Sequence, residues 1–173
     1  MSKIRVVHYI NQFFAGVGGE EQAHIEPELR KELPPISEQL QAKLGDEFEI
    51  VAAVVCGDSY FNENLEKAQA TLLEMIKGEN PQLFIAGPAF NAGRYGVAAG
   101  TITKLIQDKL HIPAVTAMYI ENPGVDMYRK DVYIVEATDS AAGMRKVLPK
   151  LAKLAAKLAK GEEILSPAED GYI

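Results

Sequence analysis

Short apolar runs alternate with longer stretches of helical periodicity along this chain. Each run is brief, often β-branched, and bounded by polar residues, glycine or proline, which is typical of strands buried on both faces of a sheet. The runs predict five strands, at residues 4–10, 48–55, 83–86, 112–117 and 132–135. The helical patterns predict helices at residues 36–44, 65–77, 95–110 and 141–160.

This order of strands and helices predicts right-handed βαβ crossovers. We therefore expect an α/β domain with three layers, of Rossmann-like or flavodoxin-like type, built on a mainly parallel five-stranded sheet. The domain is expected to span residues 1–161, because Gly161 follows the last helical pattern. Residues 162–173 are acidic, contain Pro167, and are interpreted as a linker or tail.

Composition narrows the location and the partners of the protein. Its 173 residues include 18 Lys and Arg against 24 Asp and Glu, and the net charge of −6 disfavours a generic nucleic-acid binder. No apolar run approaches the roughly 20 residues that span a bilayer, and the first residues lack a signal-peptide pattern, so we expect a cytoplasmic protein without a membrane partner. The single cysteine, Cys56, excludes an internal disulfide. These features neither predict nor exclude a homo-oligomer.

Ligands of open parallel sheets bind beyond the carboxyl ends of the strands, so the loops at that edge carry the candidate chemistry. The loop after the third predicted strand opens a helix and contributes four candidate binding residues, Asn91, Gly93, Arg94 and Tyr95. The helix amino terminus and the guanidinium both favour an anion such as a carboxylate or a phosphate. In the alternative interpretation, Gly96 and Gly100 only let the helix lie close to the sheet, and Arg94 pairs with a local acid.

The other loops add polar candidates. The glycine-rich segment after the first strand ends in Glu20 and Glu21, which are candidate partners of a ligand amine unless the segment is a lid with solvated carboxylates. Its glycine spacing does not match a dinucleotide-binding fingerprint. Cys56, at the end of the second strand, is interpreted as a core residue rather than a nucleophile. The remaining candidate binding residues are Asp58, Ser59, Tyr60, Glu121, Asn122 and Ser140.

These loops together resemble one protein family, selenoprotein B of the glycine, sarcosine and betaine reductase complexes. The segments that carry the resemblance are residues 6–14, 18–21, 56–60, 87–96, 121–127 and 140–145. The resemblance implies reductive C–N cleavage of a small amino acid together with a pyruvoyl-bearing subunit. It also implies transfer of the carboxymethyl group to selenoprotein A, and release of acetyl phosphate by a further component.

Family proteins are more than twice this length, and their selenocysteine lies in the carboxyl-terminal half. The resemblance therefore implies an amino-terminal portion that has no cofactor of its own, is inactive alone, and leads through residues 162–173 toward the other half. By charge complementarity, Arg94 and the backbone N–H groups after Gly93 would meet the substrate carboxylate, and Glu20 or Glu21 together with Glu121 would meet the amine. The alternatives are a non-catalytic docking module for the pyruvoyl subunit and, from fold analogy alone, a flavin or nucleotide binder.

Overall fold

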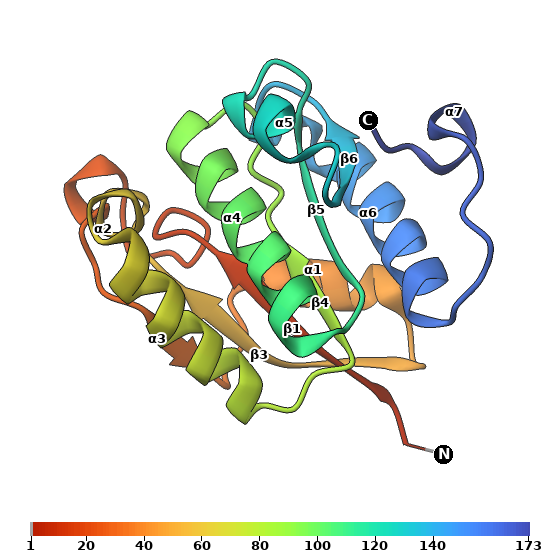
Figure 1. Ribbon diagram of the computed structural model, residues 1–173, viewed down its shortest axis with the longest axis horizontal. Helices are drawn as coiled ribbons and strands as arrows, with labels where there is room; N and C mark the ends of the chain where they lie inside the picture. The colour runs from red at the N-terminus through yellow and green to blue at the C-terminus, as the bar shows by residue number, and fades with distance from the viewer. Residues whose placement is uncertain (1) are drawn as a thin grey trace.

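The computed structural model describes residues 2–173 and contains a six-stranded sheet with the strand order β2-β3-β1-β4-β5-β6 (Figure 1). All neighbouring strands pair in parallel except β2 and β3. The mainly parallel α/β architecture is confirmed. The strands are β1 (Ile4–Ile10), β2 (Glu28–Arg30), β3 (Phe48–Val55), β4 (Leu83–Ala86), β5 (Ala114–Tyr119) and β6 (Tyr133–Ala137).

The prediction of five strands is wrong by one, because β2 was not expected. This strand has only three residues, two of them charged, and it pairs antiparallel with the end of β3 at the edge of the sheet. Three residues are too few to show the alternation of apolar and polar positions by which a strand is predicted.

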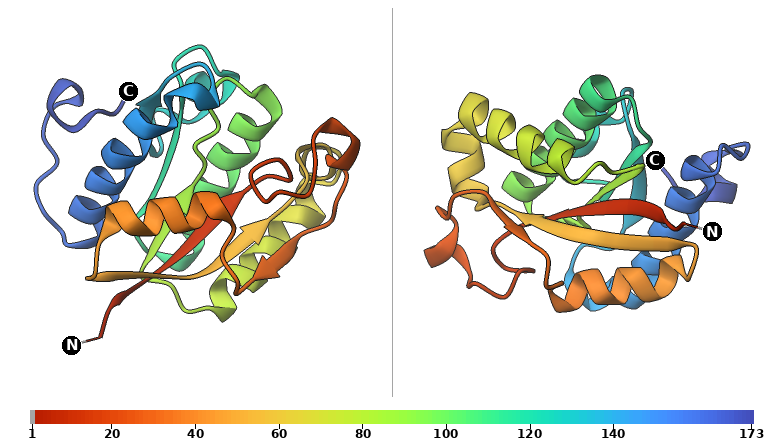
Figure 2. Two further views of the ribbon diagram at one scale, coloured as in Figure 1. Left: turned by 180° about the vertical axis from the view of Figure 1, so that it is seen from behind. Right: turned by 90° about the horizontal axis from the view of Figure 1, so that it is seen from below.

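Helices cover both faces of the sheet (Figure 2). Helices α1 (Pro35–Leu44) and α6 (Met144–Ala159) pack on one face, where Leu40 and Leu151 are fully buried. The other face carries three helices, α2 (Asp58–Glu63), α3 (Leu65–Gly78) and α4 (Gly93–Leu110). Alternate residues of β1 enter the two cores, which explains why its sequence is almost continuously apolar.

Close packing joins α4 to the short helix α5 (Pro123–Tyr128). A Cβ atom on Gly96 would overlap the Asn122 side chain, and one on Gly100 would overlap the Tyr128 ring. The two glycines therefore make room for side chains at the ends of α5 rather than for the sheet itself. This contact fixes the first turn of α4, from which several candidate binding residues project.

The last residues fold back onto the sheet. Helix α7 (Pro167–Asp170) begins with a capping box at Ser166, and the Ile173 N–H donates to the Ile134 carbonyl oxygen over 2.8 Å. The carboxyl terminus consequently lies beside β6 (Figure 1). None of the helices within residues 2–173 has the length and apolar character needed to cross a bilayer.

Candidate functional site

A cavity of about 280 Å³ lies beyond the carboxyl ends of β1, β3, β4 and β6. The segments that follow these four strands supply its walls, as expected for a parallel sheet. Four aromatic side chains line it, from Phe13, Phe14, Phe90 and Tyr95. Its polar side chains come from Asn11, Gln12, Glu20, Asp58, Asn91, Asp139 and Ser140.

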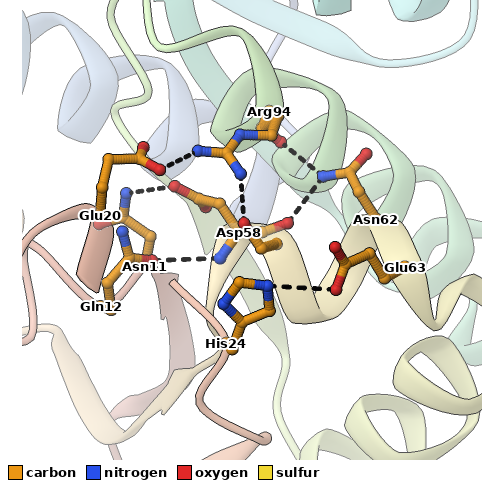
Figure 3. Close-up of polar contacts among 9 residues, drawn as sticks. Asn11, Gln12, Glu20, His24, Asp58, Asn62, Glu63 and Arg94 are labelled. Atoms are coloured by element: carbon orange, nitrogen blue, oxygen red, sulfur yellow. Dashed lines mark hydrogen bonds and ion pairs between the residues drawn. The ribbon is translucent and has the colours of Figure 1, made fainter. Parts of the chain in front are cut away.

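Two amides at the end of β1 hold the first residue of α2 in place. The Asn11 side-chain amide donates to Asp58 Oδ2 over 2.9 Å, and Gln12 Oε1 accepts from the Asp58 backbone N–H over 3.1 Å. All three residues are buried. Because the loop after β3 is tied to β1 in this way, Asp58 has a fixed position in the cavity wall (Figure 3).

Asp58 is poorly solvated and incompletely hydrogen-bonded. Its Oδ1 atom is buried without a hydrogen-bond partner among residues 2–173. Burial is the main cause that raises the pKa of this carboxyl to about 6, and the contact with Asn11 and the charge of Arg94 oppose part of the rise. A group with these properties in a cavity is a candidate for ligand binding.

Two tyrosine hydroxyls near Asp58 are unpaired in the same way as its Oδ1 atom. The hydroxyls of Tyr9 and Tyr95 are both buried without a hydrogen bond in the described part of the chain. Desolvation raises the pKa of each, and the Asp58 charge adds to both shifts. Buried polar groups are normally paired, so three unpaired ones beside a cavity indicate a place where a ligand or an ordered water binds.

The aromatic side chains form a connected wall. The Phe14 ring lies 6.0 Å from both the Phe90 and the Tyr95 ring, centroid to centroid, and packs edge-on against Phe13 at 5.2 Å. Phe90 has a φ of +48°, and its carbonyl oxygen accepts from the Asn122 side-chain amide over 2.9 Å. Asn122 therefore positions the aromatic wall without lining the cavity itself.

Arg94 is committed to protein partners. Its guanidinium donates to the Glu20 carboxylate (Figure 3) and to the Ser59 hydroxyl. The contact with Glu20 agrees with the alternative interpretation of the sequence, in which Arg94 pairs with an acidic side chain of the protein rather than with a ligand. Arg94 is not among the residues that line the cavity. The charged side chains that do line the cavity, Glu20, Asp58 and Asp139, are all acidic. The lining consequently gives no support to an anion site beside Arg94.

The structure brings only some of the predicted residues together. Five of them line the cavity, namely Glu20, Asp58, Asn91, Tyr95 and Ser140. Ser59 is not in the lining, and its hydroxyl accepts a hydrogen bond from the Arg94 guanidinium. The others lie outside: Glu21 accepts from the Gly19 N–H over 2.9 Å, Tyr60 packs against the core, and Gly93 faces Pro123. Glu121 lies beside Tyr119 and raises the pKa of its hydroxyl.

Several lining residues were not among the predicted binding residues. Asn11 and Gln12 directly follow a buried strand, which is a signal that was available in the sequence. Phe14 and Phe90 carried no such signal, because an aromatic residue in a loop is as readily explained by packing. Asp139, two residues after the end of β6, also lines the cavity.

Two further side chains near these loops, Cys56 after β3 and His8 in β1, have structural roles. Cys56 is buried, and burial raises the pKa of its thiol to about 12, so the thiolate is not accessible at neutral pH. His8 is buried between the Gly87 carbonyl oxygen, 2.7 Å from Nε2, and the Ser37 hydroxyl, 2.8 Å from Nδ1. Burial lowers its pKa to about 4, as is typical of a hydrogen-bonded core histidine.

The family model described as glycine/sarcosine/betaine reductase selenoprotein B matches residues 3–173. The chain belongs to this family. It is 72% identical to the glycine reductase complex component B subunit gamma of Peptoclostridium litorale, over 100% of the chain and 40% of that relative. It is 59% identical to the sarcosine reductase complex component B subunit beta of Peptoclostridium acidaminophilum, over 99% of the chain and 39% of the relative.

A more distant family member shows the breadth of the group. Identity to the betaine reductase complex component B subunit beta of Peptoclostridium acidaminophilum is 37%, over 97% of the chain and 38% of that relative. The chain thus spans about 40% of the length of the curated relatives it matches. No solved structure matches it. The resemblance to the reductase selenoprotein B family is therefore confirmed.

Proposed function

We propose that this chain is the amino-terminal portion of the substrate-specific component B of a glycine or sarcosine reductase, and that its cavity receives the small amino acid. The observation that carries the proposal is the cavity beyond the strand ends, whose wall residues Asp58 and Tyr95 each have a buried oxygen, Oδ1 and the hydroxyl, without a hydrogen-bond partner among residues 2–173. The relatives that support the substrate class are named for glycine and sarcosine at 72% and 59% identity. The betaine relative is less similar, at 37%.

The contribution of this portion is to bind the substrate and to orient it. Reductive C–N cleavage in the family draws on a selenocysteine and on a pyruvoyl group of a partner subunit, and neither is among the residues of this chain. Its one cysteine, Cys56, is buried and protonated. We therefore assign to this chain the holding of the substrate and the exclusion of water around it, in contact with the pyruvoyl-bearing subunit and selenoprotein A.

A docking module is the second candidate, and exposed apolar side chains favour it. Phe13 is 59% exposed at the rim of the cavity, and Ile120 and Met127 are 48% and 53% exposed on the segments after β5. Such side chains are common in protein interfaces. The same edge of the sheet would then contact a partner subunit without holding substrate.

A cavity-filling substitution separates the two candidates. Ala141 is exposed and lines the cavity, whereas its neighbour Ala142 is exposed and does not. In intact component B, Ala141→Trp is expected to abolish substrate-dependent reductase turnover and calorimetric binding of glycine or sarcosine. Ala142→Trp is the matched control and is expected to retain both. Unchanged substrate affinity in Ala141→Trp, with partner capture lost, would favour the docking module.

A further inference from the structure

We infer that the cavity binds the ammonium group of its ligand, and that the Asp58 carboxylate is the group that receives it. This inference rests on the proposed function and specifies how the ligand is oriented. The charge of the lining points to a cation, because its ionisable side chains include three carboxylates and neither lysine nor arginine among residues 2–173. Of the three, Glu20 is already paired with Arg94, which leaves Asp58 and Asp139.

Asp58 has the hydrogen-bonding capacity that an ammonium ion requires. Oδ2 accepts from Asn11, whereas Oδ1 is buried and accepts from no group in the described chain. A buried carboxylate with an empty acceptor position is stabilised by a donor that also carries positive charge. The nearby cation, Arg94, is directed to Glu20 and Ser59 and makes no ion pair with Asp58 within residues 2–173 (Figure 3).

Tyr95 supplies a second acceptor in the same wall. Tyr95 is among the lining residues, and its buried hydroxyl makes no hydrogen bond in the described part of the chain, although the nearby Asn11 backbone opposes part of the rise in its pKa. A tyrosine hydroxyl oxygen can accept a hydrogen bond from an N–H donor. An ammonium group between Asp58 and Tyr95 would satisfy both residues at once.

The aromatic wall completes a cation site. The rings of Phe14, Phe90 and Tyr95 surround the same cavity and present faces or edges within one connected cluster. Aromatic faces attract any ammonium ion, methylated or not. The empty acceptors on Asp58 and Tyr95 discriminate further, since a quaternary ammonium has no N–H to donate and would leave both unpaired. The site therefore selects a ligand with N–H donors.

The inference is tested with small molecules that carry either a cationic ammonium group or a carboxylate, but not both. Binding of glycinamide, tetramethylammonium and acetate to the full chain is followed by NMR chemical shifts of the cavity residues. We expect glycinamide to bind more tightly than tetramethylammonium, and acetate to leave the cavity signals unchanged. Asp58→Asn, which keeps an oxygen for Asn11, is expected to weaken glycinamide binding about tenfold or more. Tyr95→Phe is expected to weaken it less.

Controls separate this inference from the proposed function. Asp108→Asn removes the same charge at the far, exposed end of α4 and is expected to leave glycinamide binding unchanged. Glycinamide binding that survives Asp58→Asn, or acetate shifts in the cavity, would overturn the ammonium assignment, as would the absence of any glycinamide shift. Loss of glycine binding in Ala141→Trp alongside such a result would show that the cavity is the site and only the orientation is wrong. Glycine binding that survives Ala141→Trp would overturn the proposed function itself.

Discussion

The Arg94 guanidinium donates to the Glu20 carboxylate, joining the first turn of α4 to the short 3₁₀ turn Glu20–Gln22 at the mouth of the cavity. The two side chains are 46% and 75% exposed, so water screens their attraction. A second contact in this region pairs His24 with Glu63 of α2. These exposed contacts add to the backbone hydrogen bonds that the Ser59 and Tyr60 N–H groups donate to the Ala23 carbonyl oxygen over 2.8 and 3.0 Å.

Removal of the Arg94 side chain is expected to loosen the glycine-rich segment after β1 with little loss of global stability. An exposed ion pair contributes up to about 1 kcal/mol, so Arg94→Ala should change the free energy of unfolding by no more than that. Amide hydrogen exchange of residues 18–23 should become faster, as measured by mass spectrometry. Lys104→Ala, which removes another exposed ion pair of α4, is the control and should leave that segment unchanged. A much larger loss of stability would show that Arg94 supports the core.

Substitution of Gly96 tests the contact between α4 and α5. A Cβ atom there would overlap the Asn122 side chain, whose amide donates to the Phe90 and Ala92 carbonyl oxygens over 2.9 and 3.1 Å. We expect Gly96→Ala to lower the free energy of unfolding by about 1–3 kcal/mol, from overpacking and displaced hydrogen bonds. Equilibrium unfolding in urea measures this change.

Gly78 provides the matched comparison for Gly96. It ends α3, and a Cβ atom there meets nothing within 4 Å. Gly78→Ala is therefore expected to leave stability unchanged or raise it by about 0.5–1 kcal/mol, because alanine loses less backbone entropy on folding. Equal effects of the two substitutions would contradict the close packing of α4 against Asn122.

The long elements were predictable from the sequence, whereas the side-chain network of the site was not. Helix α3 repeats its apolar positions over 14 residues, and its predicted bounds differ from the observed ones by one residue. The short helices α2 and α5 have six residues each, fewer than two turns, and showed no comparable repeat. Element length and periodicity explain this difference.

The direction of Arg94 illustrates what the sequence did not contain. The amino terminus of α4 and a guanidinium in its first turn favour an anion on local grounds. The partner that Arg94 selects, Glu20, lies 74 positions earlier in the chain and approaches only after the sheet has formed. The sign of the charge that lines the cavity therefore depends on a tertiary contact. The cavity itself lies beyond the carboxyl ends of the strands, where parallel sheets bind ligands.

Asp58 makes stability depend on pH in a predictable direction. Its pKa is about 6 in the folded protein, above the usual value near 3.8, chiefly because of burial. Between those values the folded state holds more protons than the unfolded state, so the contribution of Asp58 to stability falls as the pH rises from about 4 to about 6. The size of the loss is about 2–3 kcal/mol.

The comparison of wild type with Asp58→Asn isolates this effect. His8 has the opposite sign, because its lowered pKa of about 4 makes its contribution rise over the same range. The measured quantity is thus the difference in unfolding free energy between the two proteins at each pH, in which His8 cancels. Among the neighbouring charges, that of Arg94 lowers the pKa of Asp58 and that of Glu20 raises it. A pH-independent difference would show that the Asp58 carboxyl is well solvated.

Cys56 is expected to be inert in the folded protein. Its side chain is fully buried, and burial together with the Asp58 charge raises the pKa of the thiol to about 12. Because only the thiolate attacks disulfide reagents, an aromatic disulfide such as Ellman's reagent should react with native chain only as fast as the protein opens. Urea should restore one equivalent of fast-reacting thiol per chain, since the sequence has a single cysteine. Rapid modification without denaturant would instead reveal an accessible thiolate at the end of β3 and contradict the burial of Cys56.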